Sequence, residues 1–428
     1  MLYKIVYFIV ISQFDKHEKI YKIIIMINKN EILKSYFGYD NLKPEQAQII
    51  DLILDKKDTI GLLPTGYGKS ICFIIPSLIL EGLTIVITPL IALMNDQVNS
   101  LKKRYIKAEF INSLQTNTEK EIIYNRLLNN KIKILFISGE RLFTKRFSEI
   151  LKKINISLIV FDESHTLLWS EDFRFTLSKI PSFLNSFNSR PPILALTATA
   201  TKLTINKINK ILCLNNPNLV VGDCDRKNIY YRVIRTDNKE RNLLSFLSKH
   251  KDKILIYCMT IKNCEYLYYQ LLELGYNVRL YHGMLEKDDK NKSQNDFMRG
   301  FANIMIATNA FGMGIDIPDI RYVIEYDLPS SIEDYIQQVG RVSRDGKYGE
   351  GILLFDRKDI STNEYFIENI QNDNIDKKEL NQIKLDRYQK LDKMIELALT
   401  AKCLHQLTSN YFGHKHPGKC MMCSNCKK

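Results

Sequence analysis

The sequence predicts an α/β protein with two units of similar size, each built on a parallel sheet, followed by a helical segment. Apolar runs rich in β-branched residues alternate with amphipathic stretches from Ile32 to about Asn215, and the alternation restarts near Lys253. Continuous apolar strands separated by helical lengths are typical of parallel sheets covered on both faces. After Asp356 the strand-like runs stop, and charged amphipathic helices lead to a cysteine-rich end.

This pattern divides the chain of 428 residues into four parts. We expect an N-terminal extension at 1–29, a first unit at 30–215, a second unit at 216–358 and a helical part at 359–428. The segment Asn215–Asn228 is expected to link the two units. The expected strands are 58–63, 83–87, 132–137, 158–161 and 193–196 in the first unit, and 254–257, 278–281, 304–307, 322–324 and 352–355 in the second.

The N-terminal stretch Met1–Ser12 is apolar with one early lysine, which loosely resembles a signal peptide. It has no small-residue cleavage site, and it is too short to span a bilayer as a helix. We expect a peripheral strand or an extension without function there, and no membrane association elsewhere.

Residues Leu62–Ser70 read Leu-Leu-Pro-Thr-Gly-Tyr-Gly-Lys-Ser, between an expected strand and an apolar helix start. Gly66 and Gly68 leave room for backbone N–H groups to approach phosphate oxygens. Lys69 reaches the terminal phosphates, and the hydroxyl of Ser70 holds Mg²⁺. A phosphate at this helix N-terminus also meets the positive end of the helix dipole. The segment therefore predicts an ATP or GTP site; the alternative is a glycine-containing turn that only mimics the pattern.

Two further clusters would complete such a site. Asp162 and Glu163 follow an apolar strand, where Asp162 would hold Mg²⁺ and Glu163 would orient the attacking water. Arg341 and Arg344, three residues apart, would neutralise charge that develops on the γ-phosphate. Taken alone, an acidic turn or an arginine pair is more often solvated surface.

Four cysteines near the C-terminus have metal-ligand spacing: Cys403, Cys420, Cys423 and Cys426. Four thiolates suit tetrahedral Zn²⁺. An iron–sulfur site is the alternative, but the close fourth cysteine and the following proline are missing. The nearby histidines, expected at the surface and at best spare ligands, are His405, His414 and His416. The other five cysteines are scattered, which favours a reducing compartment over a disulfide framework.

In chain order, the segments 37–46, 65–70, 88–94, 162–165, 197–199 and 337–346 resemble the successive motifs of superfamily 2 helicases. The stretches FGYDNLKPEQAQII, PLIALMNDQ, ATNAFGMGIDIPDIRYVIEYDLP and IQQVGRVSRDG resemble the RecQ family in particular. The resemblance covers roughly residues 30 to 426. It implies two RecA-like domains with parallel sheets plus a small helical zinc-binding subdomain. DEAD-box RNA helicases carry a different acidic tetrad and typically begin the final motif with histidine, where this chain has Gln337.

The resemblance also assigns residues around the nucleotide. It implies that Gln46 reads the adenine edge with Tyr39 and Lys43 near the base, although Lys43 stands where the family usually has arginine. Three more residues are assigned to the nucleotide site: Thr65, Tyr67 and Gln337. In the last motif, Val342-Ser343 replaces a small Ala-Gly pair and leaves both arginines in place.

The loop after the acidic pair resembles the aromatic-rich loop that couples single-stranded DNA to hydrolysis in the family. Trp169 and Phe173 would stack on bases, and Arg174 lies beside them; the alternative for Trp169 is core packing. Glu171 replaces a usual histidine and Phe175 a usual proline, so we expect the strength of this coupling to differ in this chain.

The resemblance implies an ATP-dependent 3′-to-5′ DNA helicase or translocase that uses ATP, Mg²⁺ and Zn²⁺ in repair, recombination or replication. We expect single-stranded and forked DNA as partners, a monomer, and an intracellular reducing location such as the nucleus or cytoplasm. The net charge of +13 fits an anionic partner. An RNA helicase and a non-catalytic ATP clamp are the alternatives. Larger relatives carry a winged-helix module after the zinc site, so we expect weaker duplex unwinding from this short form.

Overall fold

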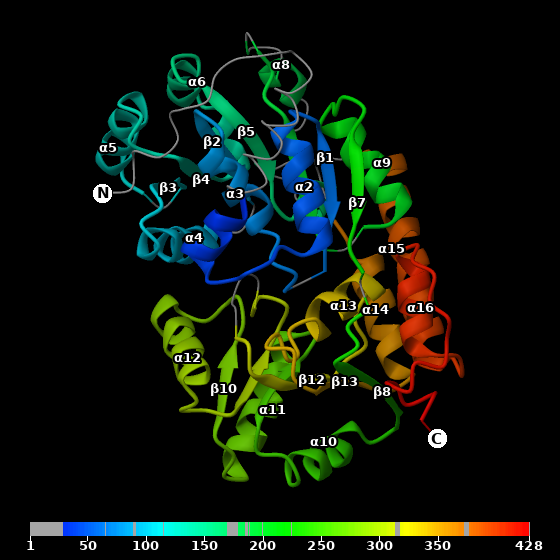
Figure 1. Cartoon of the computed structure of the whole chain (residues 1–428). Coiled ribbons are helices and arrows are strands. Elements are labelled where there is room, and N and C mark those ends of the chain that lie inside the picture. Colours follow the sequence, from blue (N-terminus) through cyan, green and yellow to red (C-terminus); the bar gives the residue numbers. More distant parts are fainter. Residues whose placement is uncertain are drawn as a thin grey trace.

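The computed structural model describes residues 29–64, 66–88, 91–113, 115–168, 179–184, 187, 189–198, 200–223, 225–312, 317–371 and 376–427. Two parallel sheets lie one above the other, and the C-terminal helices run along one side of both (Figure 1). None of the helices in these ranges combines the length and the apolar character needed to cross a bilayer.

The first sheet has seven strands in the order β3-β4-β2-β5-β6-β1-β7, and every pairing is parallel. Its strands are β1 (Thr59–Leu62), β2 (Leu83–Ile87), β3 (Ala108–Ile111), β4 (Ile134–Ile137), β5 (Ile156–Phe161), β6 (Ile193–Thr197) and β7 (Asn218–Val221). The central strands are buried along their length because helices cover both faces. The first domain also contains α2 (Pro44–Leu54), α3 (Ile71–Ile79), α4 (Ile91–Lys103), α5 (Asn117–Leu128), η1 (Gly139–Phe143), α6 (Lys145–Leu151), η2 (Ser164–Leu168), α8 (Ile180–Leu184) and α9 (Lys202–Ile211).

The second sheet has six parallel strands in the order β10-β11-β9-β12-β13-β8. Its strands are β8 (Ile229–Arg235), β9 (Lys253–Tyr257), β10 (Val278–Tyr281), β11 (Ile304–Ala307), β12 (Ile320–Glu325) and β13 (Gly349–Phe355). Its helices are α10 (Lys239–Leu247), α11 (Ile261–Glu273), α12 (Lys287–Arg299) and α13 (Ile332–Val339). Gly351 lets α13 pack close to β13, since a Cβ there would collide with Val339.

The C-terminal part consists of α14 (Lys358–Glu368), α15 (Lys377–Leu399), α16 (Leu404–Tyr411) and the cysteine-rich end. Its apolar side chains, among them Leu391 and Met394, belong to the same core cluster as Tyr231 and Tyr335 of the second domain. The cysteine-rich end also lies along β8: the N–H of Tyr231 donates to the Met422 carbonyl at 3.0 Å, and that of Ser424 to the Tyr231 carbonyl at 2.9 Å. This contact covers the free edge of the second sheet.

The predicted fold class is confirmed, and each expected strand has a counterpart within a few residues. The sequence analysis did not identify β3, β7 and β8. The prediction of a linker throughout Asn215–Asn228 is wrong, because β7 pairs with β1 inside the first sheet. The connection between the sheets therefore begins after Val221. β7 was missed because its apolar run, Leu219–Val221, is only three residues long, and only one of the four strand residues is buried.

Asp58 joins three strands at one end of the first sheet, and its side chain is buried. Its carboxylate accepts bonds from Arg190 at 3.1 and 2.7 Å, from the N–H of Ile193 at 2.9 Å and from the N–H of Asn215 at 2.7 Å. We expect Asp58→Ala to destabilise the protein by about 3 kcal/mol, because these donors lose their acceptor. Denaturant unfolding measures this.

Asp55→Ala is the matched control, since Asp55 is half exposed and forms only a surface ion pair with Lys57. It should change the free energy of unfolding by less than about 0.5 kcal/mol. Equal effects of the two substitutions would contradict the proposed role of Asp58.

Candidate nucleotide site and zinc centre

The phosphate loop joins β1 to α3, and Ser70 is the N-cap residue of α3. Gly66 and Gly68 adopt φ values of +77° and +86°, which side chains rarely allow. Gln46 on α2 holds this loop from one side, because its amide nitrogen donates to the carbonyls of Tyr67 at 2.9 Å and Gly68 at 3.2 Å. At the start of α3, the N–H groups of Ile71 and Cys72 donate to the carbonyls of Gly68 at 3.1 Å and Lys69 at 3.0 Å, so phosphate oxygens would meet the N–H groups of the loop that precedes them.

The residues assigned to the adenine lie beside this loop. The Nζ atom of Lys43 lies 4.0 Å from the ring centroid of Tyr67, and the Tyr67 hydroxyl donates to Glu45. Gln46 Oε1 accepts from the N–H of Lys43 at 3.0 Å. Burial, and then the nearby charge of Arg226, lower the pKa of Lys43. Tyr39 is exposed in the turn before α2, and Thr65 lies outside the described residues.

The acidic pair follows β5, directly opposite the phosphate loop. Glu163 Oε1 lies 3.2 Å from Lys69 Nζ, and Glu163 has a φ of +48°, an uncommon conformation found at functional sites. Burial and the adjacent Glu163 raise the pKa of Asp162 to about 6. Burial opposes ionisation of Glu163, but the charges of Lys69 and His165 hold its pKa below the usual value. His165 Nδ1 lies 2.8 Å from Thr197 Oγ1, which connects the acidic pair to the end of β6.

The two arginines reach this region from the second domain, in the loop after α13. The Arg344 side chain lies against Gly66, 3.4 Å from where a Cβ on that glycine would be. The structure thus brings Arg344 to the phosphate loop from the facing domain. Arg341 is buried, and its guanidinium donates to the carbonyl of Gly312 in its own domain.

Gln337 does not lie at the phosphate loop. It lines a cavity of about 530 Å³ between the two domains and the C-terminal helices, together with His165, Asp334 and Lys390. The residues predicted to contact nucleic acid, Trp169, Phe173 and Arg174, lie outside the described residues.

The four cysteines predicted to bind metal come together at the C-terminus: the sulfur atoms of Cys403, Cys420, Cys423 and Cys426 all lie within 4.8 Å of one another. Burial disfavours the thiolate of Cys423, but N–H groups, first that of Leu404, outweigh it and lower its pKa to about 7. Four cysteine sulfurs brought this close together fit tetrahedral Zn²⁺, which would hold α16 against the chain end.

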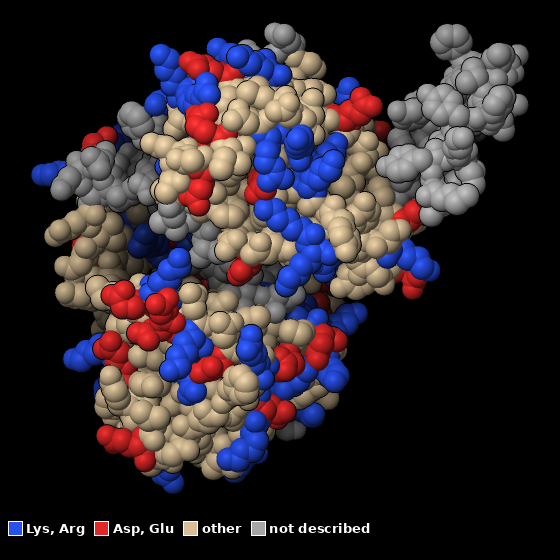
Figure 2. Space-filling model, turned by 90° about the vertical axis from the view of Figure 1, so that its left-hand side faces the viewer, with Lys and Arg blue, Asp and Glu red and all other residues tan. Residues whose placement is uncertain are grey.

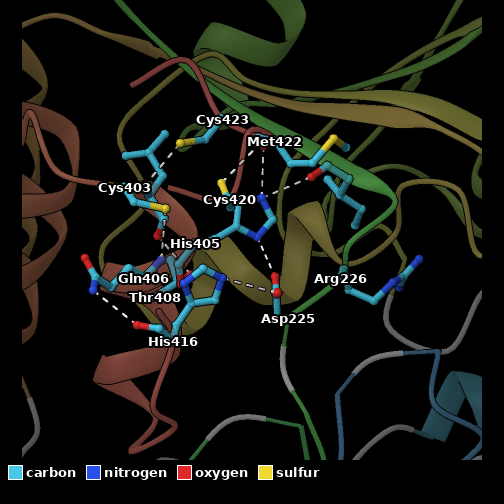
Figure 3. A network of polar contacts seen from close by, with 12 residues as sticks. Asp225, Arg226, Cys403, His405, Gln406, Thr408, His416, Cys420, Met422 and Cys423 are labelled. Carbon is cyan, nitrogen blue, oxygen red and sulfur yellow. Dashed lines mark hydrogen bonds and ion pairs between the residues drawn. The ribbon is translucent and has the colours of Figure 1, made fainter. Parts of the chain in front are cut away.

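His405 is not a surface histidine, as the sequence analysis had it. It is fully buried and stacks on Tyr231, with ring centroids 4.1 Å apart. Its Nδ1 lies 2.5 Å from an Asp225 carboxylate oxygen, and its Nε2 lies 3.0 Å from the carbonyl of Met422 (Figure 3). The side chain of His416 also approaches Asp225, at 3.5 Å. Both histidines act as structural contacts rather than spare metal ligands.

Comparisons with known proteins agree with this geometry. Family models match in three places: a DEAD/DEAH box helicase at 43–208, a helicase conserved C-terminal domain at 238–346 and a RecQ zinc-binding region at 357–427. The ATP-dependent DNA helicase RecQ of Synechocystis is 33% identical over 79% of this chain and 74% of its own length. The chain belongs to the RecQ family.

This chain is 36% identical to the ATP-dependent DNA helicase RecQ of Bacillus subtilis over 92% of the length of this chain. It is 34% identical to the protein of the same name from Pasteurella multocida, again over 92% of this chain. It spans 66% and 62% of the lengths of those two relatives. Among solved structures, S. cerevisiae Dbp5 bound to RNA and ADP BeF3 has a TM-score of 0.61 at 20% identity, covering 84% of this chain and 97% of that one. MrfA bound to DNA has a TM-score of 0.65 at 18% identity, covering 87% and 54%. These structures support the shared fold.

Sequence reasoning missed the residues that join the zinc centre to the rest of the protein. Glu333 on α13 accepts from Tyr411 at 2.8 Å and pairs with Lys390 at 2.9 Å. Asp225 and Arg226 lie in the connection between the sheets. Asp225 contacts His405, and Arg226 contacts Asn228 and main-chain carbonyls, and these contacts leave no short spacing pattern in the sequence.

We expect the purified chain to contain about one Zn²⁺ per molecule and Cys423→Ser to lose it, because the buried Cys423 supplies one of the four sulfur atoms. Thermal unfolding should begin at a lower temperature in this variant, since metal binding contributes to folding. Metal analysis and a melting curve measure both effects.

Cys213→Ser provides the control, because Cys213 is exposed and far from the cluster in sequence. It should retain full zinc content. Zinc retained in Cys423→Ser, or lost in both variants, would contradict the assignment.

Proposed function

We propose that this protein is an ATP-dependent 3′-to-5′ DNA helicase or translocase of RecQ type. The contact of Arg344 with Gly66 is the observation that carries the proposal. It supports one ATP site built from both domains, in which hydrolysis would depend on their closure. A clamp that only binds ATP would not need Glu163 beside Lys69 and an arginine from the facing domain at the phosphate loop, which disfavours the non-catalytic alternative.

Each residue of the site has a role in this proposal. Lys69 would bind the terminal phosphates, and in doing so would compete with its contact to Glu163 at 3.2 Å. Glu163 is then available to orient the attacking water. Ser70 and Asp162 would hold Mg²⁺, which would supply charge stabilisation to the phosphates when bound. Arg344 would stabilise the charge that develops on the γ-phosphate, and Arg341 would contribute from the same loop.

An anionic partner fits the distribution of charge on the surface. Figure 2 shows lysines and arginines gathered over the upper, first domain, whereas basic and acidic residues interleave over the lower one. In the first domain α4 ends with Lys102 and Lys103, and the exposed Arg104 follows. Polyanion binding of this kind is independent of sequence and weakens with salt.

DNA is the proposed substrate rather than RNA, because RecQ relatives named as DNA helicases match over 92% of the chain. RNA stays as the second candidate, since a mimivirus relative with 32% identity is named a putative ATP-dependent RNA helicase. We further propose that the protein acts as a monomer on single-stranded and forked DNA in repair, recombination or replication. A reducing intracellular compartment suits its buried free thiols at Cys72, Cys258 and Cys264.

Glu163→Gln should lower kcat for ATP hydrolysis by about 10²–10⁴-fold and leave ATP affinity nearly unchanged, because a neutral amide no longer polarises the water. Lys69→Ala should lose ATP affinity as well, since it removes a phosphate ligand. Steady-state ATPase assays with saturating single-stranded DNA, together with nucleotide binding, measure the two effects. Hydrolysis at the wild-type rate in Glu163→Gln would refute the assigned role.

Single-stranded DNA should stimulate ATP hydrolysis at least about tenfold, because productive closure of the cleft depends on the nucleic acid. An unwinding assay with matched 3′-tailed, 5′-tailed and forked duplexes should show activity on the 3′-tailed and forked substrates. The same tails made of RNA provide the comparison. No stimulation by either polymer would refute the proposed function, and preferential stimulation by RNA would favour the second candidate.

A further inference from the structure

Arg226 contacts the main chain of the loop 340–344 after α13. This loop carries Arg341 and Arg344 and is here called the arginine loop. The Nη2 atom of Arg226 donates to the carbonyls of Val342 at 3.1 Å and Ser343 at 3.0 Å, and its Nη1 reaches the carbonyl of Gly340 at 3.5 Å. Its Nε donates to Asn228 Oδ1 at 3.2 Å. A planar guanidinium offers several N–H groups in a fixed fork, so one side chain can hold successive carbonyls in a set geometry.

Asn228, the residue directly before β8, binds the main chain of the same part of the protein as Arg226. Its amide nitrogen donates to the carbonyls of Ser343 at 3.0 Å and Lys347 at 2.8 Å. The Ser343 carbonyl is therefore shared by Arg226 and Asn228. Together with Asp225 and Lys227, these two residues form the segment 225–228, here called the strap.

Ser343 needs such support because its backbone is in the left-handed region, with a φ of +45°. The RecQ resemblance predicts a glycine at this position, where glycine would adopt this φ without cost. A serine there costs on the order of 1–2 kcal/mol, and it stays only when the surroundings fix it. The N–H of Ser343 donates to the Ile320 carbonyl at 2.8 Å and its hydroxyl to the Tyr348 carbonyl at 3.1 Å, whereas the strap binds its carbonyl. Loss of the strap would release this carbonyl side of the loop and let the arginines on either side of Ser343 move.

The other end of the strap contacts the zinc centre. Asp225 accepts from His405 on α16, and α16 begins at Cys403, whose sulfur caps it. In Figure 3, Asp225 points toward His405 and His416, whereas Arg226 points away from them. Neighbouring residues of one short segment thus connect the zinc-bearing helix to the arginine loop.

We propose that Arg226 is a positioning residue that keeps the arginine loop in the conformation in which Arg344 meets the phosphate loop. Asp225 connects this loop to the zinc subdomain, which is the C-terminal part from α14 to the cysteine-rich end. The proposal rests on the proposed ATPase function. Arg226 acts on the main chain of this loop, so its loss should lower kcat while the KM for ATP stays near the wild-type value. If Arg226 instead binds the nucleotide beside Lys43, KM will rise.

The test measures kcat and KM for ATP with saturating single-stranded DNA. Arg226→Ala should lower kcat by roughly 10- to 100-fold, since a displacement of about 1 Å at a reacting centre has this effect. Arg235→Ala is the matched control: Arg235 also donates to two main-chain carbonyls, those of Ala398 at 2.9 Å and Thr400 at 2.7 Å, but it does not contact the arginine loop. It should keep kcat within about twofold of wild type.

A double-mutant cycle separates positioning from general destabilisation. If Arg226 acts through the arginine loop, Arg226→Ala should lower kcat by at most about threefold when it is introduced into an Arg344→Ala variant. In that variant the loop has already lost the side chain that meets the phosphate loop. A double variant that loses the full product of the two single effects would overturn the proposal. So would an Arg226→Ala variant with wild-type kcat, or one whose loss appears in KM.

Two milder variants cover the case in which Arg226→Ala fails to fold. Arg226→Lys keeps the charge but loses the fork, and Asn228→Ala removes two bonds from the other side of the loop. Each should lower kcat several-fold at constant zinc content and melting temperature, and wild-type kcat in both would overturn the proposal. A wild-type chain without any ATPase activity would refute the proposed function itself, whereas active wild type with fully active strap variants would refute only the role of Arg226.

Discussion

The contact between the loop after α13 and the phosphate loop after β1 is the constraint on which the rest of the structure depends. The two loops belong to different sheets, so neither domain can form this arrangement alone. Parallel topology helps, because it places the loops that follow β1 and β5 at the same edge of the first sheet. On the opposite side, close packing of α13 on β13 at Gly351 fixes where the arginine loop begins.

The zinc subdomain is attached to the two domains with very different strength. It shares a core with the second domain, pairs with the edge strand β8 and holds Glu333 on α13. Its ion pair with the first domain, Lys207 with Asp386 at 3.2 Å, is partly exposed, and such pairs contribute about 0–1 kcal/mol. Among the described contacts, this difference makes the second domain and the zinc subdomain one unit, against which the first domain would open and close.

Sequence patterns predicted the parts of the site that have local signatures. The phosphate loop, the acidic pair and the four cysteines each contain fixed spacings that follow from the ligand they hold, and the long apolar strands follow from burial on both faces. The misses have physical reasons. β7 is a half-exposed edge strand, and His405 is buried because the strap and β8 fold over it, a tertiary effect that its neighbours in sequence do not show. Arg226 and Asn228 bind carbonyls, and every residue has one, so their partners leave no trace in the sequence.

The electrostatics of the cleft explain why loop geometry matters so much. On the first domain, two adjacent carboxylates share a lysine, and burial with mutual repulsion raises the pKa of Asp162 to about 6. ATP would bring further negative charge to this side, which Lys69, Mg²⁺ and a cation from the facing domain would balance. Arg341 already donates to Gly312, which leaves Arg344 as the arginine that meets the phosphate loop. A single guanidinium stabilises developing charge best when its position is fixed beforehand. If the guanidinium had to move during the reaction, the free energy of that movement would offset its stabilisation of the transition state. The cleft therefore depends on the backbone conformation of one loop, and that conformation depends on residues far from the phosphates.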